Sequence, residues 1–225
     1  TMGNVASALP LTISVQTLGW RGAILSLAII TFAISILIYI YVKNPEKLIS
    51  INNERASVLS ILKMPIIWPI IAIMAVTYAP AAGIRGLWIS PYLSDVFMVS
   101  SKMIGTATLI MGLSMILGSF VYGPLDRILL SKKKIIFIGN LLCSMSCLLL
   151  FLLPDKALVL SVLLLALIGF FGSSFAVIIG HGRDFIPAHL TGRGVTLLNL
   201  FGIGGAGLLQ AWSGRLFLTY SSENN

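Results

Sequence analysis

Long apolar stretches, separated by short groups of charged residues, are the dominant pattern of this chain. An α-helix needs about 20 apolar residues, at 1.5 Å rise each, to cross a hydrocarbon core about 30 Å thick. Because the apolar residues follow one another without a two-residue alternation, we expect helices rather than the strands of a barrel. Six stretches of about this length contain no Asp, Glu, Lys, Arg or His and predict six full transmembrane helices: 22–42, 64–84, 103–125, 135–154, 157–180 and 194–214.

The first 20 residues are also uncharged, but their pattern is weaker. They contain Asn4, Pro10 and Gln16 within the apolar background. A secretory signal would have a basic stretch before its apolar segment, and residues 1–20 have none. We therefore interpret this stretch as the later part of a partial N-terminal helix whose beginning lies outside the sequence.

Composition supports a membrane environment. The chain of 225 residues is 57% hydrophobic and only 10% charged, and its mean hydropathy is +1.00. Soluble domains have about 25% charged residues, so this chain has too few charges for a soluble surface of its size. The predicted fold class is all-α, a polytopic membrane helical bundle with six full transmembrane helices and one partial helix.

The basic residues are distributed unevenly between the two ends of these helices. The net charge is +8. Three connections that fall on one side, 43–63, 126–134 and 181–193, hold ten Lys and Arg residues, whereas the other side holds four. Since Lys and Arg near span ends favour the cytoplasm, these three connections are predicted to be cytoplasmic. Basic residues at span ends also argue against a nucleic-acid partner.

Several short motifs give the chain a resemblance to a known family. They stand at the ends of the predicted helices, where a basic loop also follows Asp126-Arg127. The sequence resembles the C-terminal half of a major facilitator superfamily transporter in these segments: Gly19-Trp20-Arg21, the long loop 43–63, residues 86–93, Gly123-Pro124-Leu125-Asp126-Arg127 with Lys132-Lys133-Lys134, and residues 181–194.

The resemblance implies a domain organisation. Residues 1–42 would end the N-terminal bundle, 43–63 would be the central cytoplasmic loop, and 64–217 would form five helices of the C-terminal bundle. Residues 218–225 would be an extracytoplasmic tail. The chain would then correspond to helices five to eleven, and its partners would include the first four helices and the last helix of the same protein as well as the lipid bilayer.

The resemblance also implies a function. Members of this family are secondary active transporters, not enzymes, with two six-helix bundles around a central cavity and alternating access by rocking. The expectation is a multi-pass protein of the plasma (inner) membrane of a bacterium. It would move a small-molecule substrate, for which an organic anion is the candidate. A seven-helix receptor or sensor is the alternative.

Arg85 is the ionisable residue nearest to the interior of a predicted span. Tyr78 and Tyr92 stand seven residues before and after it, which is close to two helical turns, so the three are expected on one face. One interpretation places Tyr78, Arg85, Trp88 and Tyr92 on a cavity wall, with Arg85 holding an anionic group. The alternative is that Arg85 extends to the outer interface, near which its span ends, beside an aromatic belt of Trp88 and Tyr92.

A polar stripe follows the last predicted helix. Asn199 and Gln210 are eleven residues apart and therefore share a face. They are candidates for substrate binding or for hydrogen bonds to a neighbouring helix. The segment 202–207 matches G-x-G-x-x-G, but it has no strand before it, so helix packing explains it better than a dinucleotide site.

Charged residues at the cytoplasmic ends suggest a gate. Asp126, beside Arg127, is the candidate to pair with Arg183 or Arg193 of the neighbouring loop and so hold one access state. The alternative is a solvated loop whose charges only orient the protein. Exchanging the charges of Asp126 and Arg183 would distinguish the two.

No metal or cofactor is predicted. His181 and His189 are expected in one loop, where no further ligands gather, and Cys143 and Cys147 share a face of one helix as packing residues. The uncharged stretches contain no Asp, Glu, Lys or His. They therefore lack the acid, base or nucleophile of an intramembrane hydrolase and the lysine of a retinal protein.

Overall fold

The computed structural model describes residues 9–42, 57–129 and 131–223, and within them the side chains of 9, 10, 126, 127 and 220–223 are not described. All regular elements of this part of the chain are helices. The prediction of an all-α membrane bundle is confirmed. Six helical segments are long and apolar enough to cross a membrane: Leu11–Tyr41, Ile67–Phe97, Ser101–Leu125, Lys132–Leu152, Leu158–Phe185 and Ala188–Thr219.

The two first apolar stretches join in one kinked helix. Helix α2 (Leu9–Tyr41) is interrupted at Gly19, whose φ of 71° and ψ of 166° are not helical. A positive φ strains any residue with a side chain, so glycine is the residue that permits this kink. Ten residues, Leu9–Leu18, precede Gly19 in the helix.

The next span is assembled from several short pieces. After α3 (Val58–Leu62), α4 (Ile67–Thr77) is followed by α5 (Ala79–Gly83), the π-helix η1 (Ile84–Trp88) and α6 (Ile89–Phe97). Pro80 stands in the first turn of α5. Proline cannot donate a backbone hydrogen bond, and its ring crowds the preceding turn, which explains the break before α5.

The remaining helices alternate in direction across the bundle. Helices α7 (Ser101–Leu129) and α8 (Lys132–Leu152) are continuous, whereas α9 (Leu158–Gly172) and α10 (Phe175–Phe185) share one span that breaks at Ser173 and Ser174. The short η2 (Ala188–Leu190) leads into α11 (Thr191–Glu223).

Four helical paths continue beyond the C-terminal ends of the uncharged stretches that predicted them. They continue past Arg85 to Phe97, past Arg127 to Leu129, past His181 to Phe185, and past Arg215 to Glu223. The prediction that His181 lies in a loop is therefore wrong. A charged residue ends an apolar run, but it does not end a helix, because its side chain can reach water while its backbone stays hydrogen-bonded.

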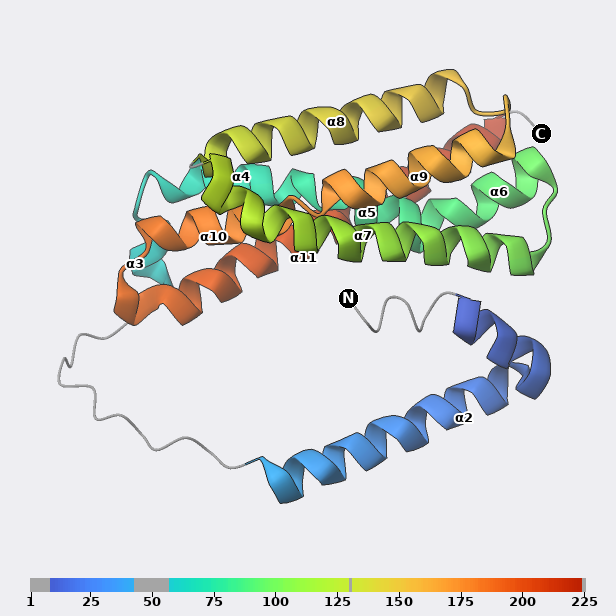
Figure 1. Ribbon diagram of the computed structural model, residues 1–225, viewed down its shortest axis with the longest axis horizontal. Coiled ribbons are helices and arrows are strands. Elements are labelled where there is room, and N and C mark those ends of the chain that lie inside the picture. Colours follow the sequence, from blue (N-terminus) through green and yellow to red (C-terminus); the bar gives the residue numbers. More distant parts are fainter. Residues whose placement is uncertain (1–8, 43–56, 130, 224–225) are drawn as a thin grey trace.

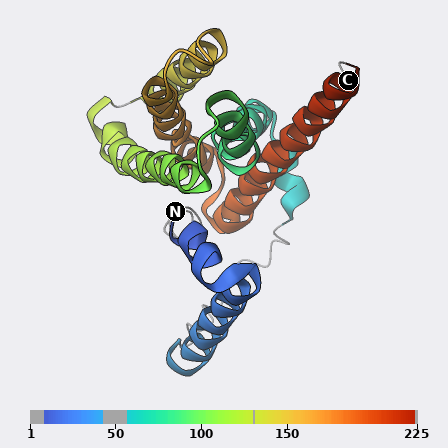
Figure 2. The ribbon, with the colours of Figure 1, turned by 90° about the vertical axis from the view of Figure 1, so that its right-hand side faces the viewer.

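Helices α4 to α11 form a bundle, and α2 lies at its edge, where it contacts α7 (Figures 1 and 2). Within the bundle, α9 packs against α7 and α8, while α11 packs against α4 and α5. We call the end where α3, the α7–α8 connection and the α10–α11 connection meet the basic end. It is on the left in Figure 1. The α6–α7 and α8–α9 connections are at the opposite end.

The apolar interior of the bundle is divided into two clusters along its length. The basic-end core contains buried residues of α3, α4, α7, α8, α10 and α11, such as Ile61, Met74, Ile135, Ile178 and Leu198. The opposite-end core contains residues of α5, α6, α7, α8 and α9, such as Ala81, Leu93, Met111, Cys143 and Ile168. Helices α7 and α8 contribute to both cores, through Tyr122 and Met111 in α7 and through Ile135 and Cys143 in α8.

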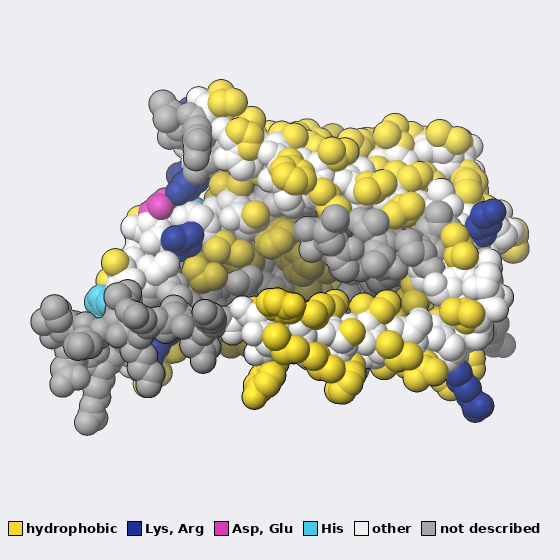
Figure 3. Space-filling view, turned by 60° about the horizontal axis from the view of Figure 1, so that its bottom comes forward, with side chains coloured by type: hydrophobic (Ala, Val, Ile, Leu, Met, Phe, Trp, Pro, Cys, Tyr) yellow, Lys and Arg dark blue, Asp and Glu magenta, His cyan; other side chains and the backbone are white. Residues whose placement is uncertain are grey.

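The outer surface matches a membrane environment. On the face shown in Figure 3, hydrophobic side chains cover the middle of the molecule, and Lys and Arg side chains lie toward the two ends. Many large apolar residues are exposed, including Phe32, Tyr39, Phe120, Phe137 and Leu208. Such a continuous apolar surface is unfavourable in water and favourable in lipid.

Candidate functional site

Arg85 lies within the π-helix η1, in the middle part of a long helical path. Eighteen residues separate it from the start of α4 at Ile67, and twelve separate it from the end of α6 at Phe97. The helix continues past Arg85 through α6, so the end of the uncharged stretch at residue 84 is not the end of the helix. Single π-helical turns are often found at functional sites, since they displace side chains from the regular helical register.

Tyr78 and Arg85 are neighbours, as their seven-residue spacing predicts. The phenol of Tyr78 is close enough to the half-buried guanidinium of Arg85 for an electrostatic interaction. The ring of Tyr78 also contacts Phe175 of α10, with 4.8 Å between ring centroids. Tyr78 and Phe175 therefore connect the α4–α6 span to the α9–α10 span.

Trp88 and Gln210 meet where η1 packs against α11. The indole Nε1 of Trp88 donates to Ser213 Oγ at 3.1 Å, and Gln210 Nε2 donates to the carbonyl oxygen of Ala82 at 3.1 Å. Ser213 Oγ in turn donates to the carbonyl oxygen of Gln210 at 3.1 Å. Glycines at positions 83 and 86 give Gln210 room to lie along η1.

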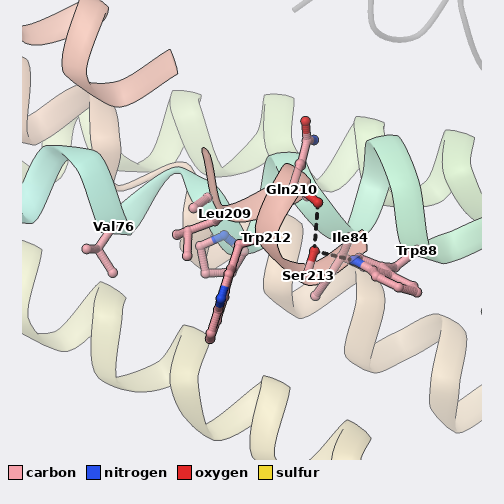
Figure 4. Close-up of a pocket in the computed structure, with 10 residues that line it drawn as sticks. Val76, Ile84, Trp88, Leu209, Gln210, Trp212 and Ser213 are labelled. Carbon is pink, nitrogen blue, oxygen red and sulfur yellow. Dashed lines mark hydrogen bonds between the residues drawn. The ribbon is translucent and has the colours of Figure 1, made fainter. Parts of the chain in front are cut away.

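These contacts border a pocket of about 220 Å³ between α5, η1 and α11 (Figure 4). Trp88, Gln210 and Ser213 supply its polar atoms, and Val76, Ile84, Leu209 and Trp212 supply apolar walls. The indole N–H of Trp88 and the side-chain Nε2 of Gln210 each donate a hydrogen bond within the bundle. Their arrangement therefore fixes η1 against α11 beside the pocket.

Tyr92 points to a different neighbour. Its hydroxyl donates to the carbonyl oxygen of Pro154 at 2.6 Å and lies 2.8 Å from Ser161 Oγ. It thus joins α6 to the α8–α9 connection rather than to α11. A second pocket, of about 450 Å³, lies on this side, and Ile84, Trp88 and Tyr92 form one of its walls. The π-helical turn between Arg85 and Tyr92 changes the helical register, which explains why Tyr92 diverges from the line of Tyr78 and Arg85.

Asn199 does not join this group. It is half-buried in the first half of α11, and it lines neither pocket beside Trp88. Of the two amides on the predicted stripe of α11, Gln210 therefore contacts η1, whereas Asn199 lies closer to the basic end.

The basic end holds an ion pair that the sequence analysis missed. Lys132 Nζ, at the start of α8, lies 2.7 Å from Asp184 Oδ2 near the end of α10, and 3.4 Å from the carbonyl oxygen of Gly180. Asp184 is the one acidic residue in 181–193. Asp184 directly follows Arg183, in a connection predicted to lie on the same side as Lys132-Lys133-Lys134. This placement of an acid near three lysines is the sequence feature from which the ion pair could have been predicted.

The structure describes only some of the side chains of the predicted gate. Arg183 and Arg193 are exposed at the basic end, in α10 and at the start of α11. Asp126 and Arg127 lie in the last turn of α7, but their side chains fall outside the described residues. A contact between Asp126 and either arginine stays a prediction.

Metal-ligating residues do not gather in the part of the chain that the structure describes, which contains no group of three or more His, Cys, Asp or Glu side chains. His181 contacts the ring of Phe185 within α10, and His189 lies in η2. Cys143 and Cys147 are free thiols on α8.

Comparison with known proteins gives one match. The family model described as Major Facilitator Superfamily matches residues 2–211. Neither the curated proteins nor the solved structures compared with the chain give a match.

Proposed function

Because the chain belongs to the Major Facilitator Superfamily, a family of transporters, we propose that it is part of a secondary active transporter that moves a small organic anion by alternating access. The choice of an anion as substrate rests on Arg85, whose guanidinium can bind an anionic group. A guanidinium inside a helical path that can span a membrane is costly in lipid, and such residues face partners, cavities or substrates. Tyr78 lies close enough to Arg85 to interact with it electrostatically.

Alternating access requires contacts that hold one state and break in another. The pair of Lys132 and Asp184 joins the start of α8 to the end of α10 at the basic end. In the proposed cycle this pair takes the role of a gate contact, with Asp126, Arg127, Arg183 and Arg193 as further charged candidates around it.

The orientation of the protein in the membrane follows from the distribution of its basic residues. We assign the basic end to the cytoplasm of a bacterial cell, with the protein in the plasma membrane, because Lys and Arg are concentrated there. In this arrangement, residues 1–42 belong to the N-terminal bundle and 64–217 to the C-terminal bundle. Further helices of the same protein and the surrounding lipid complete the structure.

Uptake by the full-length protein in proteoliposomes tests the proposal. A panel of small organic anions is offered to the parent protein, to Arg85→Gln and to Arg85→Lys. We expect Arg85→Gln to abolish uptake of the transported anion and Arg85→Lys to retain part of it, since lysine keeps the charge without the planar fork. Arg215→Gln is the matched control, because Arg215 is exposed on α11.

Two results would contradict the proposal. Unchanged anion uptake by Arg85→Gln would remove Arg85 from the substrate path. A protein that binds a ligand but moves no solute in either direction would favour the receptor alternative.

A further inference from the structure

Two thiols stand on one face of α8, in the opposite-end core. Cys143 and Cys147 are four residues apart, a spacing that places Cβ atoms about 5–6 Å from each other on one side of a helix. Cys143 is 5% exposed and Cys147 is half-buried, and their thiols are close enough to share a hydrogen bond. Both cysteines are free, so each keeps a sulfur atom that can bind another group.

Two further sulfur-bearing side chains lie in the same core. Met111 and Met115 of α7 are buried together with Cys143. Their Cγ atoms stand 3.0 and 3.1 Å from where a Cβ at Gly169 would lie, and Cys143 Sγ is 3.9 Å from the carbonyl oxygen of Ile168. Helices α7 and α8 therefore both direct sulfur-bearing side chains to the same turn of α9.

One of the two thiols borders a cavity. Cys147 lines the pocket of about 450 Å³ that Trp88 and Tyr92 also line, and the pocket reaches Pro154 in the α8–α9 connection. None of the described residues that line it is acidic or a histidine. Aromatic rings stabilise a cation through their electron-rich faces. A cation in this pocket would therefore meet aromatic and sulfur groups rather than charged oxygen ligands.

The chemistry of the ligands limits which ion they can hold. Thiolate and thioether sulfur select soft metal ions such as Cu(I), whereas carboxylates and carbonyls suit Mg²⁺ and Ca²⁺. A structural Zn²⁺ site needs four ligands, and no third His, Cys, Asp or Glu joins the two thiols in the part of the chain that the structure describes. Two sulfur atoms are enough for a soft monovalent ion, which accepts a lower coordination number.

Charge also favours a monovalent ion at this site. When such an ion binds, one thiol gives up its proton and binds as the thiolate, while the second sulfur binds through a lone pair as a neutral thiol. One positive charge enters as one proton leaves, so the site stays neutral. A net charge inside a membrane bundle is costly, and this exchange avoids it.

We propose that Cys143 and Cys147 form a binding site for a soft monovalent cation of the Cu(I) class, with the thioether of Met111 or Met115 as a third ligand. Two bonds form between the ion and the thiol sulfurs, one S–H bond breaks, and its proton leaves through the pocket beside Cys147. The ion stays monovalent, so no electron is transferred. This site goes beyond the proposed transport of an anion and does not depend on it.

Ag(I) is the probe, because it is soft and monovalent and is not oxidised by air. The full-length protein, reduced and held in lipid nanodiscs, is titrated with Ag(I) in chloride-free solution. Calorimetry in two buffers that differ in heat of protonation measures the bound ions and the released protons. We expect about one Ag(I) bound and about one proton released per chain, with Zn(II) bound far more weakly.

Cys143→Ser and Cys147→Ser each remove one sulfur ligand. Loss of a residue that only supports a metal ligand lowers affinity about 10–100-fold, so loss of a ligand itself should weaken Ag(I) binding at least about 100-fold. Met111→Leu should have a smaller effect, since a third ligand is less important than the thiols. Met145→Leu is the matched control: Met145 is an exposed thioether on α8 between the two cysteines, and its removal should leave Ag(I) binding unchanged.

A second measurement requires no variant and so does not depend on the folding of the serine proteins. Ag(I) should protect Cys147 of the parent protein from alkylation by N-ethylmaleimide, as counted by mass spectrometry. Unchanged alkylation would overturn the site, and so would parent-like affinity in either serine variant. Equal affinity for Zn(II), with two protons released, would overturn the assignment to a soft monovalent ion. Because no readout uses uptake, a failure of anion transport would leave this inference intact.

Discussion

The continuous helices α7 and α8 differ from the two broken spans, α4–α6 and α9–α10, in how they relate to the interior. Each continuous helix contributes side chains to both cores, whereas α4, α5, α9 and α10 each contribute to one. The comparison shows that α7 and α8 connect the two cores, whereas each piece of a broken span packs within one core.

Local sequence explains the breaks. Pro80 follows the end of α4 within three residues, and Gly172-Ser173-Ser174 separates α9 from α10, so both breaks have ordinary causes. Proline alone is not sufficient, because Pro124 lies inside α7, which continues to Leu129. Pro124 stands near the basic end of α7, where fewer helical turns depend on the interrupted bond.

The largest expected effect on stability concerns the contact between α11 and α4 of the α4–α6 span. A Cβ at Gly205 would collide with the backbone of Ala75 in α4, whereas a Cβ at the neighbouring Gly204 would meet nothing within 4 Å. We expect Gly205→Ala to lower the free energy of unfolding by about 1–3 kcal/mol, since backbone must move. Gly204→Ala is the matched control in thermal or denaturant unfolding of the full-length protein. Equal stability of the two variants would mean that α4 can move away from the added methyl group at no cost in free energy.

A smaller effect is expected where η1 is held to α11. Trp88→Phe removes the hydrogen bond to Ser213 but leaves an aromatic ring to pack against Phe217, whose centroid is 5.3 Å from that of Trp88. The loss should be about 1 kcal/mol, and Ser213→Ala should cost a similar amount. The two changes should not add in a double-mutant cycle, because they remove the same bond. Additive losses would show that the bond does not hold η1.

The smallest effect on stability is expected at the ion pair between α8 and α10. Asp184 is half-exposed, so Lys132→Gln or Asp184→Asn should change the free energy of unfolding by less than about 1 kcal/mol. The distance between spin labels placed on α8 and α10 should nevertheless shift toward the separated state. Exchanging the charges, with Lys132→Asp and Asp184→Lys, should restore the parent distribution. If the single variants leave the distribution unchanged, the pair does not restrain α10.

The sequence alone determined the class of the protein and the number of its long helices. Apolar stretches of membrane length separated by charges can be counted without a structure, because each helix satisfies its own backbone in lipid. The seven-residue spacing of Tyr78 and Arg85 also predicted that they lie close enough to interact electrostatically, since it depends only on helical geometry within one span.

Tertiary structure decided what lies between the helices. Where α6 ends, how the π-helix turns Tyr92 toward Pro154, and which acid meets Lys132 depend on packing between segments that are far apart in the sequence. The same holds for Ser173 and Ser174, which are adjacent and chemically identical. One hydroxyl reaches Met115 of α7 and the other reaches no partner, because only the positions of the neighbouring helices distinguish them.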